Sequence, residues 1–173
     1  MTAMHEGATV EEANKMMVLG LFRAFGKGDV SWINDFVSDD YVQHSILGPP
    51  PGKEGLKKFF AVLGTAFPDL RIDIQDITAE GDKVFLRARV TGTWNGEWNG
   101  KRPNGKSFDI VEFDELRIED GKIAEHWDAL DIVTMMRQLE IPIDWAGGGP
   151  STLLVCGAHQ GLSWPKREWN IPR

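Results

Sequence analysis

The sequence is short of cysteine and of positive charge. Its 173 residues contain a single cysteine, Cys156, and 19 Lys and Arg against 26 Asp and Glu, which gives a formal net charge of −7. A single cysteine excludes an internal disulfide and a zinc site built on cysteines, and the four scattered histidines show no ligand spacing. Because phosphate backbones are bound by clustered Lys and Arg, we expect neither nucleic acid nor a metal ion as a partner.

Long apolar runs are also missing. No segment approaches the roughly 20 apolar residues of a membrane-spanning helix. Glu6, Glu11 and Glu12 lie near the start of the chain, where a secretory signal would be apolar. The 42% of hydrophobic residues is enough for one compact core. We therefore expect a cytoplasmic protein that does not contact a membrane.

Helical signals fill the first part of the chain. Thr9-Val-Glu-Glu12 has the spacing of a capping box, and apolar residues then recur every three or four positions as far as Phe25. A short helix is predicted over about 30–37. A third helix places its apolar residues on one stripe and ends before Pro68, which cannot continue it.

From Leu70 the apolar period changes to two, which is typical of half-buried strands. Strands are predicted from Leu70 onward, over 83–94, over 108–118 and over 123–131, with an Asp-Gly hairpin turn between the last two. The segment 95–105 contains too many turn-forming residues to be regular, so it is a predicted loop. A final helix reaches about Leu139. Helices followed by a meandering antiparallel sheet indicate an α+β architecture.

The last residues differ from the rest of the chain. Segment 141–150 has the composition of a linker, and Trp145, Trp164 and Trp169 account for three of the seven Trp. We expect one domain over residues 1–139 and a C-terminal extension over residues 140–173. The extension either crosses onto a partner subunit and covers its pocket, or it packs outside or stays disordered.

Five segments between Val10 and Leu139 carry a resemblance to a known family. They are Gly52-Lys-Glu-Gly-Leu56, Phe67-Pro-Asp-Leu70, Arg117-Ile-Glu-Asp-Gly-Lys-Ile123, Glu125-His-Trp-Asp128 and Met136-Arg-Gln-Leu139. In this order and spacing the chain resembles the SnoaL-like polyketide cyclases, within the nuclear-transport-factor-two and ketosteroid-isomerase cone fold. The resemblance implies a curved antiparallel sheet wrapped around the N-terminal helices, a deep pocket inside the cone, and frequent dimerisation through sheets.

The resemblance also implies catalytic residues. In this family an Asp near the end of the hairpin's second strand acts as the acid/base, and it matches Asp128. The founding aromatic-polyketide cyclases pair this Asp with a His on the facing strand, whereas this sequence has Asp114 at the matching position. An Asp there is similar to the ketosteroid isomerases, in which a protonated carboxylic acid donates a hydrogen bond to a developing oxyanion. Asp128 and Asp114 are therefore the predicted catalytic residues.

The register of the hairpin decides which face Asp128 occupies. With a two-residue turn and an unbroken ladder, Trp127 shares the apolar face with Asp114, and Asp128 points away. A β-bulge before Asp128 adds one residue and reverses the side chains beyond it. We predict this bulge, which turns His126 and Asp128 inward and Trp127 to the outer sheet face. Its absence would favour Asp131 as the acid/base.

Glu112 and Asp114 are two carboxylates on an otherwise apolar strand face. Because removing a carboxylate from water is costly unless it is paired or protonated, we expect burial to raise at least one of the two pKa values. Either group can instead pair with Arg87 or Arg89 of a neighbouring strand. Judged by its spacing alone, Asp128 is equally compatible with an exposed strand carboxylate.

The remaining candidates are predicted to bind substrate. His44 lies where the family's pocket wall carries polar groups, and His126 joins the pocket if the bulge turns it inward. Trp94 and Trp98 flank the start of the loop and are able to stack on a planar polycyclic ligand. The alternative for both Trp residues is a plain role in the core or in anchoring the loop.

These observations predict an enzyme without a cofactor that removes a carbon-bound proton next to a carbonyl and directs the enolate to intramolecular aldol cyclisation or isomerisation. The expected substrate is a small apolar or aromatic carbonyl compound, and the expected assembly is a homo-oligomer, either a dimer or a tetramer. Two alternatives stay open. One is a non-catalytic binding or docking module of the same fold, and the other is a hydrolase or dehydratase that positions water with carboxylates.

Overall fold

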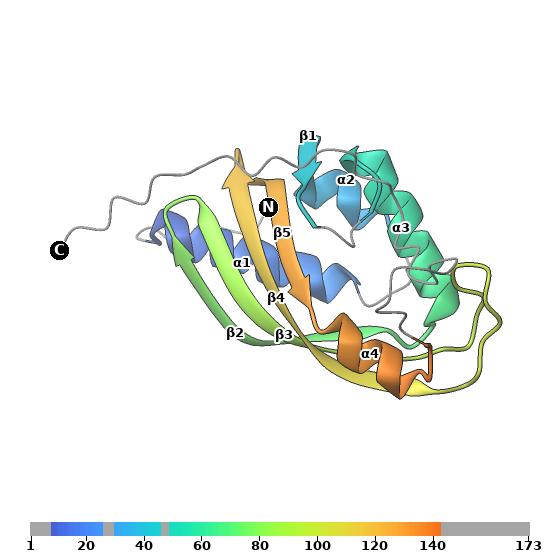
Figure 1. The fold of residues 1–173 in the computed structure, drawn as a ribbon. Helices are drawn as coiled ribbons and strands as arrows, with labels where there is room; N and C mark the ends of the chain where they lie inside the picture. The colour runs from blue at the N-terminus through green and yellow to red at the C-terminus, as the bar shows by residue number, and fades with distance from the viewer. Residues whose placement is uncertain (1–7, 26–29, 46–48, 143–173) are drawn as a thin grey trace, which may run out of the picture.

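The structure is a computed structural model that describes residues 8–25, 30–45 and 49–142. The C-terminal extension beyond Pro142, with Cys156, Trp145, Trp164 and Trp169, lies outside the described residues. Every predicted helix and strand is confirmed, with boundaries that differ by a few residues. The elements are α1 (Val10–Phe25), α2 (Trp32–Phe36), β1 (Val37–Gln43), α3 (Gly52–Ala66), β2 (Arg71–Glu80), β3 (Lys83–Thr93), β4 (Ser107–Glu119), β5 (Lys122–Leu130) and α4 (Ile132–Gln138), as Figure 1 shows.

The strands form one curved sheet of five strands in the order β1-β5-β4-β3-β2. The three hairpin-linked pairs are antiparallel, as expected. One edge departs from the antiparallel pattern, because β1 pairs with β5 in parallel. Parallel neighbours need a long connection, and here α3 and strands β2 to β4 separate the two strands along the chain. The sheet is not closed, so β1 and β2 are its edges.

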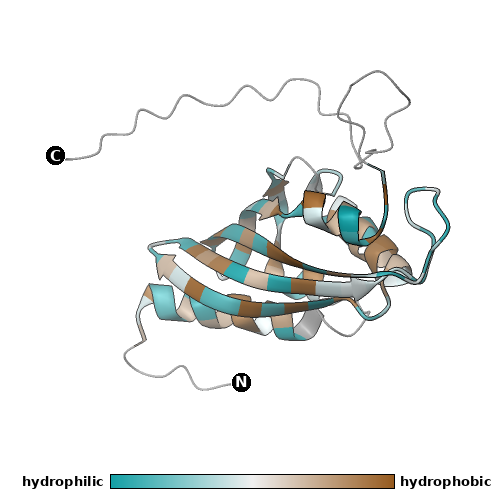
Figure 2. Ribbon diagram, turned by 60° about the horizontal axis from the view of Figure 1, so that its bottom comes forward, coloured by the Kyte–Doolittle hydropathy of each residue, from teal (hydrophilic) through white to brown (hydrophobic). Residues whose placement is uncertain are grey.

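The helices give the sheet an inner and an outer face. α1 lies along β2 and β3, α3 lies beside β1, and α4 lies beside β4 (Figure 1). Along the strands hydrophobic residues alternate with hydrophilic ones, as Figure 2 shows by colour. Because successive strand residues point to opposite faces, this alternation buries one face against the helices. Within the described ranges, no helix has the length and apolar character needed to cross a membrane.

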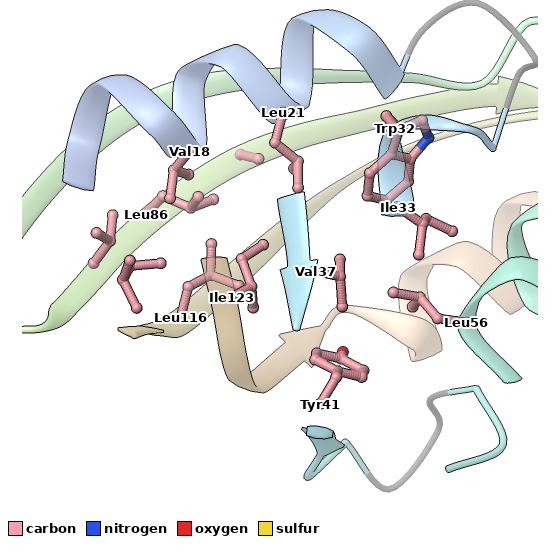
Figure 3. Packing of buried hydrophobic residues seen from close by; sticks show 13 residues of the cluster. Val18, Leu21, Trp32, Ile33, Val37, Tyr41, Leu56, Leu86, Leu116 and Ile123 are labelled. Carbon is pink, nitrogen blue, oxygen red and sulfur yellow. The ribbon is translucent and has the colours of Figure 1, made fainter. Parts of the chain in front are cut away.

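The buried side chains form two clusters along the inner face. The first joins α1, α2 and α3 to the sheet, and Figure 3 shows it from close by. The second lies farther along the sheet, between the end of α3 and α4. The first includes Val18, Leu21, Ile33, Leu56, Leu86, Leu116 and Ile123, and the second includes Phe67, Val90, Phe108, Ile110, Met135, Leu139 and Ile141. The first part of the C-terminal extension, at Ile141, thus packs into the core.

Two local signals have the expected geometry. The backbone N–H of Glu12 donates to Thr9 Oγ1 at 3.2 Å, which caps α1. Asp120 and Gly121 both have positive φ, 50° and 70°, as a two-residue hairpin turn between β4 and β5 requires. The turn sets the register at the start of β5, and therefore the faces on which the later residues of β5 lie.

Candidate active site

A cavity of about 300 Å³ lies on the inner face of the sheet, between the helices and the strands. Members of both core clusters line it, so most of its wall is apolar. Most of its polar groups come from three adjacent strands and meet at one region of the sheet. They are Tyr41, Gln43 and Ser45 from β1 and its continuation, His126 and Asp128 from β5, and Glu112 and Asp114 from β4.

The predicted β-bulge in β5 is confirmed. Ile118 of β4 pairs with Ile123 of β5. The residue before Ile118, Arg117, pairs with Glu125, so Ala124 is the extra residue. Beyond the bulge Asp114 pairs with Asp128, which places both side chains on the same face.

The same bulge turns Trp127 to the outer face, as predicted. There its ring contacts Lys83 Nζ, 5.3 Å from the ring centroid. The nearby Phe85 and Phe113 are both exposed, at 40% and 54%. A role of this outer face in dimerisation stays a prediction.

Residues in β1 and just after it orient the side chain of Asp128. Gln43 Nε2 donates to Asp128 Oδ2 at 3.2 Å, and Ser45 Oγ donates to Oδ1 at 2.5 Å. Hydrogen bonds from neutral donors stabilise an ionised carboxylate and limit its rotation. Both carboxylate oxygens therefore have defined positions in the cavity.

Asp114 and His126 form a buried pair across β4 and β5. Asp114 Oδ1 lies 2.8 Å from His126 Nε2, and the two side chains are 3% and 19% exposed. Burial by itself lowers the pKa of His126, but the hydrogen bond and charge of Asp114, with the charge of Asp128, outweigh it and raise this pKa above the usual value. Asp114 Oδ2 is buried and has no hydrogen-bond partner among the described residues. The raised pKa favours the protonated form of His126 beside the Asp114 carboxyl in the cavity wall.

Glu112 is a cavity carboxyl whose pKa is strongly raised. Burial, followed by the charges of Asp114 and Asp128, raises its pKa well above the usual value. Within the described ranges it has no hydrogen bond or ion pair. The alternative that Arg87 or Arg89 neutralises this face is wrong, because those side chains pair with Asp76 and Asp109. The raised pKa favours the neutral form of Glu112, whose side chain lines the cavity.

Replacing Glu112 with Gln is expected to remove one contribution to the pH dependence of the free energy of unfolding. A raised pKa means that the folded chain keeps a proton that the unfolded chain releases, so this group costs stability as the pH rises from about 4.5. Relative to the wild type, the free energy of unfolding of Glu112→Gln should increase with pH over this range. Urea unfolding between pH 4 and pH 8 measures the difference, and the exposed Glu119→Gln on the same strand is the control. Parallel curves for wild type and Glu112→Gln would contradict a raised pKa.

Two of the predicted substrate-binding residues lie elsewhere. His44 does not line the cavity: its ring stacks on Trp127 with centroids 4.2 Å apart, and its Nε2 lies 2.7 Å from Glu125 Oε2. Side chains alternate along an extended strand, so His44 faces the opposite side from Gln43 and Ser45. Trp94 is 3% exposed and belongs to the second core cluster, which bears out its alternative role in the core.

Trp98 lines the cavity as predicted. Its ring centroid lies 5.2 Å from that of Phe67, in an edge-on contact. The loop that carries it is tied to the end of α3, because the N–H groups of Asn95 and Gly96 both donate to Ala66 O at 3.0 Å. A Cβ at Gly96 would lie 2.0 Å from Thr65 O, so only glycine permits this approach.

Sequence reasoning missed three polar cavity residues, Tyr41, Gln43 and Ser45. A signal for them was present, because positions 41, 43 and 45 alternate, as residues on one face of a strand do. The face that contacts the cavity depends on the pairing of β1 with β5, which periodicity does not define. Asp131, the alternative acid/base, instead caps α4 by accepting from the Thr134 N–H at 3.1 Å.

Comparisons with known proteins agree with this fold. A family model, SnoaL-like polyketide cyclase, matches residues 15–139. Two curated relatives, the aklanonic acid methyl ester cyclases DauD of Streptomyces sp. (strain C5) and DnrD of Streptomyces peucetius, are each 27% identical over 131 residues; the match covers 73% of this chain and 81% and 90% of theirs. The crystal structure of IdmH from Streptomyces antibioticus is 33% identical, with a TM-score of 0.65 over 73% of this chain and 98% of that one. The chain therefore belongs to the SnoaL-like polyketide cyclase family.

Proposed function

We propose that this protein is a polyketide cyclase that removes a carbon-bound proton next to a carbonyl and directs the enolate to an intramolecular aldol ring closure. The observation that carries the proposal is the meeting of Asp128, Glu112 and the Asp114–His126 pair at one region of an otherwise apolar cavity. A mostly apolar wall strengthens the electrostatic interactions of these groups with a bound carbonyl compound.

Asp128 is the proposed base. Its carboxylate faces the cavity and is oriented by donors from Gln43 and Ser45. A carboxylate removes a proton from carbon when the substrate is activated, as a β-dicarbonyl is, or when the enolate oxygen is stabilised. The proton moves to Asp128, the enolate carbon bonds to a second carbonyl carbon of the same molecule, and the resulting alkoxide takes a proton back.

Glu112 is the proposed donor to the enolate oxygen. Its raised pKa favours the protonated carboxyl, and no described residue accepts a hydrogen bond from it. A neutral acid is suited to this role because it donates a hydrogen bond without placing a second negative charge beside the enolate. Glu112 thus takes the role for which Asp114 was the sequence-based candidate, since Asp114 pairs with His126.

The apolar wall supports the ring closure itself. Phe59, Phe60, Phe67 and Trp98 line the cavity from α3, the residue after it and the loop. A folded substrate bound against these rings has its reacting carbons close together, and such proximity contributes strongly to an intramolecular reaction. We infer a substrate with large apolar or aromatic surface and at least two carbonyl groups.

The test uses aklanonic acid methyl ester, the compound named for DauD and DnrD, as the test substrate. Incubation with the purified protein is expected to give a product of unchanged mass with a new ring, detected by NMR and mass spectrometry. Exchange of the hydrogen next to the carbonyl for deuterium from D₂O before ring closure would support the same mechanism. Binding of the test substrate with neither exchange nor conversion would favour a carrier. A product that has gained or lost water would favour a hydrolase or a dehydratase.

A further inference from the structure

Gln43 lies at the centre of the polar groups of the cavity. It is the last residue of β1 and is the register partner of His126 in the parallel β1–β5 pair. Its Oε1 faces His126 Nδ1 at 3.0 Å and also accepts a hydrogen bond from the Tyr41 hydroxyl. Its Nε2 donates to Asp128 Oδ2 at 3.2 Å. The side-chain amide therefore connects the Asp114–His126 pair to Asp128.

The orientation of this amide follows from what each neighbour is able to donate. An ionised carboxylate only accepts, so the NH₂ group of Gln43 has to face Asp128. The amide oxygen then faces His126 Nδ1, which has to donate. The other ring nitrogen, Nε2, faces Asp114, which also only accepts. Both nitrogens donate only when the imidazole ring carries its second proton, so protonated His126 and this orientation of Gln43 require each other.

We propose that Gln43 is a positioning residue, which aligns Asp128 through a side-chain amide whose orientation is set by His126. The proposal rests on the proposed function, because it treats Asp128 as the base. When the His126 ring loses its second proton, it no longer donates to both of its neighbours in the hydrogen-bonded series Asp114–His126–Gln43–Asp128. Gln43 is then free to turn, and Asp128 loses its Nε2 donor.

Several titratable groups surround His126 and enter this pH dependence. Asp114 faces it from β4, Asp128 lies on its own strand, and Tyr41 faces it from β1 with Oη 3.4 Å from Nδ1. Glu112 of β4 lines the same cavity, as do two cations, Lys58 of α3 and Lys101 of the loop after β3. Of these, Asp114 and Tyr41 contact the ring directly.

Two substitutions of Gln43 separate its possible roles. Gln43→Glu keeps the size of the side chain and the acceptor for His126, but it removes the donor to Asp128. Gln43→Leu removes both. The added charge in Gln43→Glu should raise the pKa of His126, whereas Gln43→Leu should lower it. If Gln43 acts by donating to Asp128, both variants lose about 10- to 100-fold in kcat on the test substrate with little change in KM.

The result that would overturn the proposal is a Gln43→Glu variant with the wild-type kcat and pH profile. That outcome would mean that Gln43 serves only as an acceptor for His126. Gln75→Glu, an exposed position on β2, makes the same chemical change outside the cavity and is the matched control. Asp128→Asn separates this inference from the proposed function, since full turnover by Asp128→Asn would refute the base assignment itself.

A second measurement needs no substrate. In ¹⁵N-labelled full-length protein, the side-chain amide signal of Gln43, identified by its absence in Gln43→Glu, should shift with pH at the same midpoint as the ring nitrogens of His126. Below that midpoint, both ring nitrogens should show bound protons. A Gln43 signal that does not shift as His126 titrates would overturn the proposed coupling even if the variants lost activity.

Discussion

Asp128→Asn is expected to lower kcat on the test substrate by about 10²- to 10⁴-fold, the range that a positioned acid or base contributes. The amide is close in size to the carboxylate and is able to accept the hydrogen bond from Ser45 that Asp128 accepts at 2.5 Å. It does not accept a proton at neutral pH, so proton removal should fail while the cavity keeps its shape. The dissociation constant for the test substrate should therefore stay close to that of the wild type.

Steady-state kinetics and calorimetric titration measure these two quantities separately. Asp131→Asn is the matched control, because it removes the same charge from an exposed residue that caps α4. Unchanged turnover in Asp128→Asn would remove Asp128 from the mechanism. A loss of binding as large as the loss of turnover would mean that Asp128 holds the substrate and does not act on the proton.

Asp114→Asn is expected to be strongly destabilising, by about 3–5 kcal/mol, which is typical when one partner of a buried ion pair is removed. Asparagine is still able to accept a hydrogen bond from His126, but it no longer compensates the charge of a ring that is 19% exposed. The double variant with His126→Gln should be more stable than the sum of the single effects predicts, because no uncompensated charge remains.

The pH dependence of this effect follows from the raised pKa of His126. Below about pH 6.5 the ring is protonated in the folded and in the unfolded chain, so the full stabilisation by the pair is present. As the pH rises through the folded-state pKa, the ring loses its proton and the stabilisation is lost. The difference between wild type and Asp114→Asn in urea unfolding should therefore be largest below pH 6.5 and shrink above it.

Asp109→Asn on the same strand is the control for this second prediction. Its carboxylate pairs with Arg89 at the exposed surface, where screening by solvent makes such pairs weak. Little change in the free energy of unfolding of Asp109→Asn is expected at any pH. An Asp114→Asn variant with the stability of Asp109→Asn would show that the Asp114–His126 contact does not stabilise the fold.

The fold was largely predictable because its signals are local. The capping box at Thr9, the stop at Pro68 and the Asp120-Gly121 turn each act within a few residues. The bulge was predictable for another reason: without it, Asp128 would point away from Asp114, in conflict with the role implied by the family resemblance. The parallel pairing of β1 was missed because it joins segments far apart in the sequence.

The site was predictable on β4 and β5 but not on β1. Glu112, Asp114, His126 and Asp128 share a hairpin, so a turn and one bulge determine their common face. His44 was chosen because it lies where the family's pocket wall carries polar groups, but the structure places it on the outer face against Trp127. A residue in an edge strand faces the cavity or the solvent depending on its pairing with a distant strand.

The sequence by itself determined the elements, their order, the α+β class and the hairpin that carries three carboxyl groups and a histidine, because helix stripes, strand alternation and turn residues act over short distances. The tertiary structure alone decided which groups hold Asp128. The hydrogen bond between Gln43 and His126 joins residues 83 positions apart, and it exists only because β1 lies parallel to β5. Such a contact depends on the packing of the whole sheet, which no local pattern encodes.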